Sequence, residues 1–374
     1  MKRIAFLLCV LAAVLLLSGC WDYRGMDDLT IVTGIAVDRD EVSGGYRLLV
    51  EAVDINSVKQ ETSGSTPLFI EAEGRTLREA LNGTRKRLYG QLFFSNMQVL
   101  IVSRQIAETE GVTQVINFFL NDIDIREALD VVISGETSAA ALLQGALLDY
   151  SLMSFQLEHI IQSYQKSASY SVSSNLYQAF DSLQAPGKHL LLPFFQLREH
   201  QDGKIAEARG LAYFSGDRLA GLLERDEVYA HFMVTGSPSA LLLTIPAAES
   251  ETGYLAFYLM RCDGRQDVRF ESGKLFLSVA IQMEASPETI SGSDDEMDAL
   301  TTRLETHTAR SIAALITEMQ AKKLDILGFA STLYKTDYAL WQQLEPHWSR
   351  LFAEAEVEIS VNCTLRFSGI MREE

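Results

Sequence analysis

The sequence predicts an α+β fold with two or three domains, in which mixed or antiparallel sheets are flanked by helices. Of the 374 residues, 47% are hydrophobic and 22% are charged, which is typical of a globular chain long enough for several buried cores. Segments with the two-residue alternation of strands are interleaved with segments of helical spacing, but the two do not strictly alternate. The sequence contains no internal repeat at a solenoid period.

The first 19 residues predict a lipoprotein signal peptide that is cleaved before Cys20. Lys2 and Arg3 supply a positive start, and residues 4–17 are almost continuously apolar, a run too short to span a bilayer comfortably. Ser18 and Gly19 are the small residues that a lipoprotein peptidase requires. We therefore expect a covalent diacylglycerol on the thiol of Cys20 and an N-acyl chain such as palmitate. An ordinary secretory signal with an incidental cysteine is the alternative.

The charge of the chain restricts its partners. The formal net charge is −18, and it becomes −20 when Lys2 and Arg3 are removed with the signal peptide. Such an acidic body is repelled by nucleic acid and by anionic lipid headgroups. No later stretch approaches the ~20 apolar residues of a transmembrane helix. The lipid on Cys20 is therefore the expected link to the membrane.

The N-terminal region, residues 20–188, is expected to be one α+β unit with a candidate division near residues 135–150. Polar turns and a Ser/Thr/Gly-rich loop separate its first strands. Two helices rich in Gln, Ser and Tyr precede Pro186-Gly187, which ends the region. Strands are expected at 29–37, 46–55, 68–72, 97–102 and 129–133, and helices at 76–88, 112–120 and within 151–183.

The C-terminal domain, residues 189–374, is expected to begin with consecutive hairpins and to end in a helix pair and a long strand. In that strand, residues 357–367, apolar side chains alternate with polar ones, which places Cys363 on the core side. We expect the two preceding helices to cover this face of the sheet. Strands are predicted at 190–197, 210–214, 219–223, 240–245, 254–262 and 274–283, and helices at about 300–319 and 332–344.

Only two cysteines remain unmodified in the mature chain, because Cys9 leaves with the signal peptide and Cys20 is acylated. Cys262 and Cys363 could form a disulfide in an oxidising compartment, or each could be a small buried hydrophobic residue. The sequence leaves both alternatives open.

The sequence lacks the motifs of catalysis and of cofactor binding: G-x-S-x-G, the P-loop, G-x-G-x-x-G and H-E-x-x-H. We therefore predict that the protein is not an enzyme and has no catalytic, cofactor-binding or metal-binding residues. The histidines are scattered without the spacing of metal ligands. They are His159, His189, His200, His231, His307 and His347.

Three further features have a structural interpretation that we prefer to a functional one. Asp122 and Asp124 resemble part of a calcium loop, but Glu127 stands where the turn needs glycine. The acidic residues 293–296 could bind a cation, but they also precede a helix N-terminus, where the macrodipole favours negative charge. Trp341 and Trp348 could line a binding surface, although packing is the preferred explanation.

A set of short segments recurs in a characteristic order along the chain: 19–22, 28–29, 34–38, 75–80, 86–89, 98–102, 210–214, 219–222, 325–329, 346–348 and the terminal strand to Gly369. In their order and spacing these segments resemble the Ger(x)C family, the C subunits of bacterial spore germinant receptors. The resemblance covers most of the mature chain, and no single segment is highly specific. One departure is Phe94-Ser95-Asn96, where the family often has a Gly-His pair, so that Asn96 stands in place of a family histidine.

The resemblance implies a lipid-anchored, non-enzymatic subunit on the outer face of the inner spore membrane. It would assemble with multi-pass A and B subunits in a receptor that senses nutrients and triggers germination. Recognition of a small-molecule germinant by this subunit is left open. The alternative is a solute-binding lipoprotein of an importer, which would favour two α/β lobes, whereas consecutive hairpins are predicted from 190 to 283. A lipid-anchored hydrolase would need a nucleophile and base or a metal.

Overall fold

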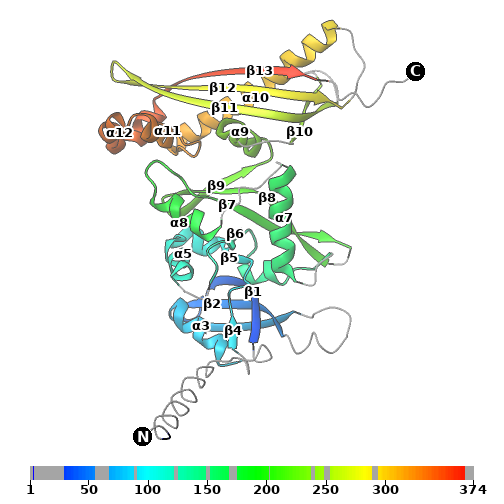
Figure 1. Ribbon diagram of the computed structural model, residues 1–374, viewed down its shortest axis with the longest axis vertical. Coiled ribbons are helices and arrows are strands. Elements are labelled where there is room, and N and C mark those ends of the chain that lie inside the picture. The colour runs from blue at the N-terminus through cyan, green and yellow to red at the C-terminus, as the bar shows by residue number, and fades with distance from the viewer. Residues whose placement is uncertain are drawn as a thin grey trace, which may run out of the picture.

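The computed structural model describes Arg3 and residues 29–54, 67–87, 91–121, 125–148, 152–167, 175–201, 203–236, 241–247, 253–288 and 294–366. Within them the chain forms a nine-stranded sheet and a four-stranded sheet, with helices on both (Figure 1). The predicted α+β fold with mixed sheets and flanking helices is confirmed. Cys20 lies outside the described residues, as does the predicted signal peptide apart from Arg3.

The nine-stranded sheet begins as an antiparallel meander and continues with parallel strands. Strands β1 (Leu29–Arg39), β2 (Tyr46–Asp54) and β3 (Leu68–Gly74) pair antiparallel. β1 is also parallel to β4 (Gln91–Phe93) and β5 (Val99–Ser103). All five positions of β5 and of β6 (Asp130–Ser134) are buried, as expected for central strands with covered faces. The remaining strands are β7 (Leu191–His200), β8 (Gly203–Ser215) and β9 (Arg218–Glu224).

The change from one sheet to the other comes later than the expected division at 188/189. β7 pairs parallel with β6, and the hairpin strands β8 and β9 follow β7 at the same edge of the nine-stranded sheet. The hairpins themselves are predicted correctly, but they extend the first sheet instead of opening the second. The sequence could not show this, because the β6–β7 pairing joins residues about 60 positions apart.

Helices cover both faces of the nine-stranded sheet. The first face packs against α3 (Leu77–Arg85), α4 (Arg104–Thr109), α5 (Thr113–Leu120) and α8 (Leu176–Gln184). The other face packs against α6 (Ala139–Leu143) and α7 (Met153–Ser167).

The four-stranded sheet has one covered and one open face. Strands β10 (Leu241–Pro246), β11 (Tyr254–Glu271) and β12 (Lys274–Pro287) are antiparallel, and β13 (Glu356–Leu365) returns parallel to β12 after a helical crossover. Half-buried and exposed residues alternate along β13, which confirms the predicted strand and its core face. Helices α9 (Asp226–Thr235), α10 (Asp294–Lys322), α11 (Phe329–Thr336), α12 (Tyr338–Leu344) and α13 (Trp348–Ala353) complete the unit.

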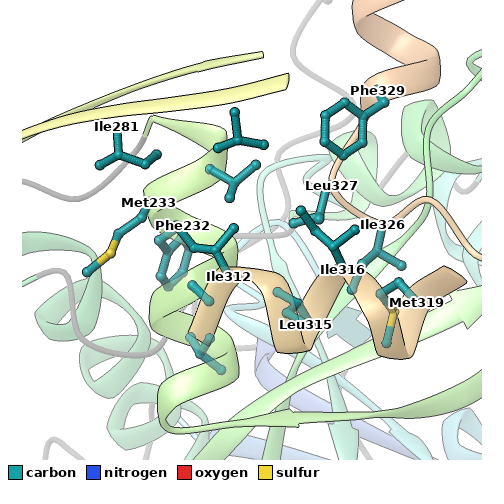
Figure 2. Close-up of a cluster of buried hydrophobic side chains, with 14 of the residues drawn as sticks. Phe232, Met233, Ile281, Ile312, Leu315, Ile316, Met319, Ile326, Leu327 and Phe329 are labelled. Atoms are coloured by element: carbon teal, nitrogen blue, oxygen red, sulfur yellow. The ribbon is translucent and has the colours of Figure 1, made fainter. Parts of the chain in front are cut away.

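The core of this second unit lies between the sheet and its helices. Figure 2 shows Phe232 and Met233 of α9 beside Ile281 of β12 and the apolar residues of α10. The helix expected at 332–344 is in fact two helices, because Asp337 leaves the helical conformation and its side chain accepts from the backbone N–H of Leu340 at 2.9 Å. The labelled residues of α10 and the loop after it are Ile312, Leu315, Ile316, Met319, Ile326 and Leu327, and Phe329 belongs to α11 (Figure 2).

Candidate functional site

The two units meet where β8 and β9 contact α9 and the C-terminal end of α10. Lys322 of α10 donates to the hydroxyl of Tyr213 on β8, and its ammonium lies 5.1 Å from the centroid of that ring. Leu211, Tyr213 and Leu223 belong to the same buried cluster as the C-terminal helices. The seam between the units is therefore a packed apolar contact with a charged group at its rim. In Figure 1 the helices α9, α11 and α12 lie between the two sheets.

A buried carboxylate joins two of the family-like segments, 325–329 and 346–348. Oδ1 of Asp325 accepts from the backbone N–H groups of Gly328 and Phe329 at 3.0 and 3.2 Å. Oδ2 accepts from the N–H of Ala330 at 2.6 Å and from Nε1 of Trp348 at 3.2 Å. Burial raises the pKa of Asp325 to about 7, although the four donors act against this shift. The arrangement caps α11 and fixes α13 against it, which is a structural role.

Two more buried carboxylates hold helix N-termini from distant strands. Asp38 at the end of β1 accepts from the backbone N–H groups of α6 residues 139 and 140 at 2.6 and 2.9 Å. Glu51 of β2 accepts from Met153 and Ser154 of α7 at 2.8 and 3.1 Å, and from Oγ1 of Thr33 at 3.0 Å. Burial raises the pKa of both carboxyls. The helix N-termini supply the donors and the positive dipole end that a buried carboxylate requires.

The histidines do not form a site among the described residues. His231 of α9 is 5% exposed and burial lowers its pKa to about 4, so it is neutral at physiological pH. His189 is half-buried beside the carbonyl of Phe214, 3.3 Å away. No group of three or more His, Cys, Asp or Glu in the described part of the chain could hold a metal. Asp122 and Asp124 lie outside it, and of the 293–296 cluster only residues 294–296 are described, at the start of α10.

Both cysteines of the C-terminal unit are free. Cys262 on β11 and Cys363 on β13 each lie opposite Met283 on β12, the strand between them. The Cα atoms of the two cysteines are therefore separated by two strand spacings of about 4.8 Å each. This distance exceeds the ~7 Å between Cα atoms that a disulfide can bridge. Burial raises the pKa of each thiol to about 12. The alternative of small hydrophobic side chains is therefore the one observed: Cys262 is buried, and Cys363 is half-buried against the core.

Trp341 and Trp348 are packed in the core. They are 3% and 7% exposed, and their ring centroids lie 5.5 Å apart at an edge-on angle. The packing explanation is confirmed. Asn96 is half-buried in the turn between β4 and β5, where its carbonyl accepts from Nε2 of Gln98 at 2.8 Å. Any role of Asn96 in place of a histidine stays a prediction.

A small pocket between α9, β10 and α10 does not suit a nutrient-sized ligand. Its lining includes Met233, Leu243, Leu304 and His307. The space open to water is about 20 Å³, roughly enough for one water molecule. Shallower depressions of about 330 and 620 Å³ lie beside α10 and beside α7. No helix among the described residues is long and apolar enough to cross a membrane.

Comparison with known proteins gives the family. A model of the spore germination protein N-terminal domain matches residues 22–197, and the spore germination B3/GerAC-like C-terminal model matches residues 209–369. The chain belongs to this GerAC-like family. Like the segments that suggested it, the two matches together span most of the chain from residue 22 to residue 369.

Full-length relatives and one solved structure agree with this assignment. The chain is 20% identical over 393 residues to spore germination protein KC of Bacillus subtilis (strain 168), covering 97% of this chain and 96% of the relative. It is 19% identical over 361 residues to spore germination protein B3 of the same organism, covering 93% and 94%. The crystal structure of the GerBC protein is similar with a TM-score of 0.56 and 15% identity, covering 92% of this chain and 99% of that one, which shows a common fold.

Proposed function

We propose that this GerAC-like protein is the lipid-anchored, non-catalytic subunit of a nutrient-sensing germinant receptor in the spore membrane. The observation that carries the proposal is the order of the two family domains, which match residues 22–197 and 209–369 and leave little of the mature chain unaccounted for. Relatives that cover the chain from end to end are named spore germination proteins.

The anchor in this proposal is the acylated thiol of Cys20. The apolar run of residues 4–17 followed by Ser18 and Gly19 supports it. Two or more acyl chains make membrane attachment stable, since each buried CH₂ contributes roughly 0.8 kcal/mol. The folded units would then stand on the outer face of the cytoplasmic membrane, which becomes the inner membrane of the spore.

The working role in this proposal is that of a scaffold for two multi-pass subunits, A and B. The packed seam between the units and the three helix-capping carboxylates make a body whose parts are held in fixed positions, which suits assembly better than turnover.

Germination assays test this proposal in the source organism. Spores that lack the protein, or that carry Cys20→Ala, are scored across a nutrient panel beside a nutrient-independent trigger. We expect loss of the response to one or more nutrients while the independent trigger still works. A normal response of the deletion strain to every nutrient would argue against a receptor role. Absence of acyl chains on Cys20 in the wild-type protein extracted from spore membranes, measured by mass spectrometry, would argue against the anchor.

A further inference from the structure

One end of the nine-stranded sheet gathers the segments nearest to the proposed lipid anchor. β1 starts at this end, β2 finishes there, and β3 and β4 start there, as their pairing registers require. α3 runs back along β3 and also ends there, where the guanidinium of Arg87 donates to the carbonyl of Glu71. In Figure 1 these elements lie at the pole opposite the four-stranded sheet. We call this region the tether end.

The tether end exposes large apolar side chains. Leu68 and Phe69 at the start of β3 are 37% and 36% exposed, and Phe93 of β4 is 40% exposed. Phe93 stands in one cross-strand row with Ile31 of β1 and Val53 of β2, both only half-buried. Paired residues in a sheet point to the same face, so this row is a continuous apolar strip. Gathered apolar groups of this kind mark an interaction surface.

The same end carries a basic cluster in a strongly acidic chain. Arg85, Lys86 and Arg87 are consecutive and exposed at the C-terminal end of α3. The carboxylates of Glu71 and Glu73, farther along β3, lie 3.4 and 3.1 Å from the guanidinium of Arg47 and are partly neutralised by it. With a net charge of −18 on the whole chain, the basic cluster gives the molecule a charge asymmetry along its length.

The length of the chain before β1 keeps the tether end close to the membrane. Leu29 comes nine residues after Cys20. Even a fully extended segment of that length spans only about 30 Å. A lipid on Cys20 therefore holds the apolar strip and the basic cluster within reach of the headgroups, whereas the four-stranded sheet lies at the far pole.

We propose that the tether end is a second membrane contact, in which Phe69, Phe93 and their apolar neighbours enter the interface while Arg85, Lys86 and Arg87 bind anionic phospholipid headgroups. This inference rests on the lipid attachment proposed above, because the anchor is what brings the surface to the bilayer. The acyl chains on Cys20 already make attachment stable, so this contact adds orientation, and a basic patch near the membrane is attracted to anionic headgroups. The contact orients the acidic body away from the membrane.

Vesicle binding by the mature-length chain without its lipid tests the surface separately from the anchor. Residues 20–374 carrying Cys20→Ser are floated with phosphatidylcholine vesicles and with vesicles in which phosphatidylglycerol replaces part of the phosphatidylcholine. We expect binding to the second kind only, and weaker binding in high salt. Replacing Arg85, Lys86 and Arg87 by Ser should lower the partition coefficient about 100-fold, at roughly fivefold for each charge.

Matched variants separate a local surface from total charge. The triple change Arg265→Ser, Lys335→Ser and Arg350→Ser removes as many positive charges from exposed sites on the other unit, and we expect it to leave binding unchanged. Phe69→Ser with Phe93→Ser should weaken binding severalfold, whereas the exposed pair Tyr254→Ser and Tyr258→Ser should not. The single change Lys86→Ser covers the case in which the basic triple variant fails to fold.

Three results would overturn the proposal: equal binding to both kinds of vesicle, no binding to either, or equal losses in the two triple variants. None of them bears on the anchor, since the tested chain has no lipid. Conversely, a normal nutrient response in the deletion strain together with selective vesicle binding would overturn the receptor role and leave the membrane surface standing.

Discussion

At the scale of single residues, Asp325 is the side chain on which most local structure depends. It is 2% exposed and both of its oxygens accept from two donors. In Asp325→Asn, an NH₂ group must face N–H donors, so we expect the free energy of unfolding to fall by about 2 kcal/mol. Urea denaturation followed by tryptophan fluorescence measures this. Asp337→Asn is the control, because it caps α12 at the surface and asparagine caps equally well; an equal loss in both variants would contradict the assignment.

Asp325 also has a pH signature of defined sign. Its pKa is about 7 in the folded chain against an ordinary value of 3.8, so the folded state binds this proton more tightly than the unfolded state does. The stabilisation is complete below pH 3.8 and is lost as the pH rises to about 7. We expect the wild-type free energy of unfolding to decline across this window more steeply than that of Asp325→Asn. Burial also raises the pKa of Asp38 and of Glu51, but the wild type and the variant both keep these groups, so their contributions cancel in the comparison. Parallel pH profiles of the two proteins would show that the pKa of Asp325 is not raised.

The sequence could place some residues and not others, for a physical reason. Alternation along residues 357–367 correctly assigns Cys363 to the core face, because this assignment depends only on a local pattern. The packing of Trp341 and Trp348 is also predicted correctly, because large aromatic side chains in and beside a helix are usually buried. The sequence pattern assigns no capping role to Asp38, Glu51 or Asp325, although Asp38 and Asp325 lie in the family-like segments 34–38 and 325–329. Their partners are backbone N–H groups, which leave no mark in a sequence, and for Asp38 and Glu51 those groups lie about 100 positions away. An acidic residue inside an apolar strand, as at Glu51, is the one available signal.

At the scale of elements, α7 is held on the sheet by a carboxylate that belongs to another element. The carboxylate of Glu51 accepts from the first backbone N–H groups of α7, while Leu157 and Ile161 of this helix pack on the sheet. In Glu51→Gln, one donor faces the amide NH₂, so we expect a loss of about 2 kcal/mol and faster hydrogen exchange concentrated in residues 153–167. Glu199→Gln on the exposed part of β7 is the control and should change neither quantity. Faster exchange spread evenly over both units would argue against a local cap.

Element prediction succeeded for the hairpin strands, for α10 and for the short buried strands β5 and β6, but it failed for α9. The hairpin strands and α10 show clear periodicity because water faces one side of each. α9 was missed because six of its ten residues are buried, including consecutive ones at 230–234, so no helical stripe is visible. The parallel pairing of β6 with β7 was also beyond reach, since pattern specifies a strand's buried face but not its partner.

At the scale of the whole molecule, the seam between the units should make them unfold together. Gly187, with φ of 68°, sits against α11: a Cβ there would lie 2.7 Å from the Cβ and 2.8 Å from the carbonyl carbon of Ala330. Gly216 has a similar φ of 61° but open space around it. Gly216→Ala should therefore cost only the left-handed strain, about 1 kcal/mol. Gly187→Ala has the same left-handed strain, and its Cβ must also displace α11 from the first unit.

We therefore expect Gly187→Ala to lower the free energy of unfolding by clearly more than Gly216→Ala does. Circular dichroism reports both units, whereas Trp341 and Trp348 report the second. The two signals should change together in the wild type and in Gly216→Ala, because one buried cluster spans the seam. In Gly187→Ala they should separate, with the tryptophan transition at lower urea. If the two signals instead change together in Gly187→Ala, and if both variants lose the same free energy of unfolding, the contact of Gly187 with α11 does not couple the units.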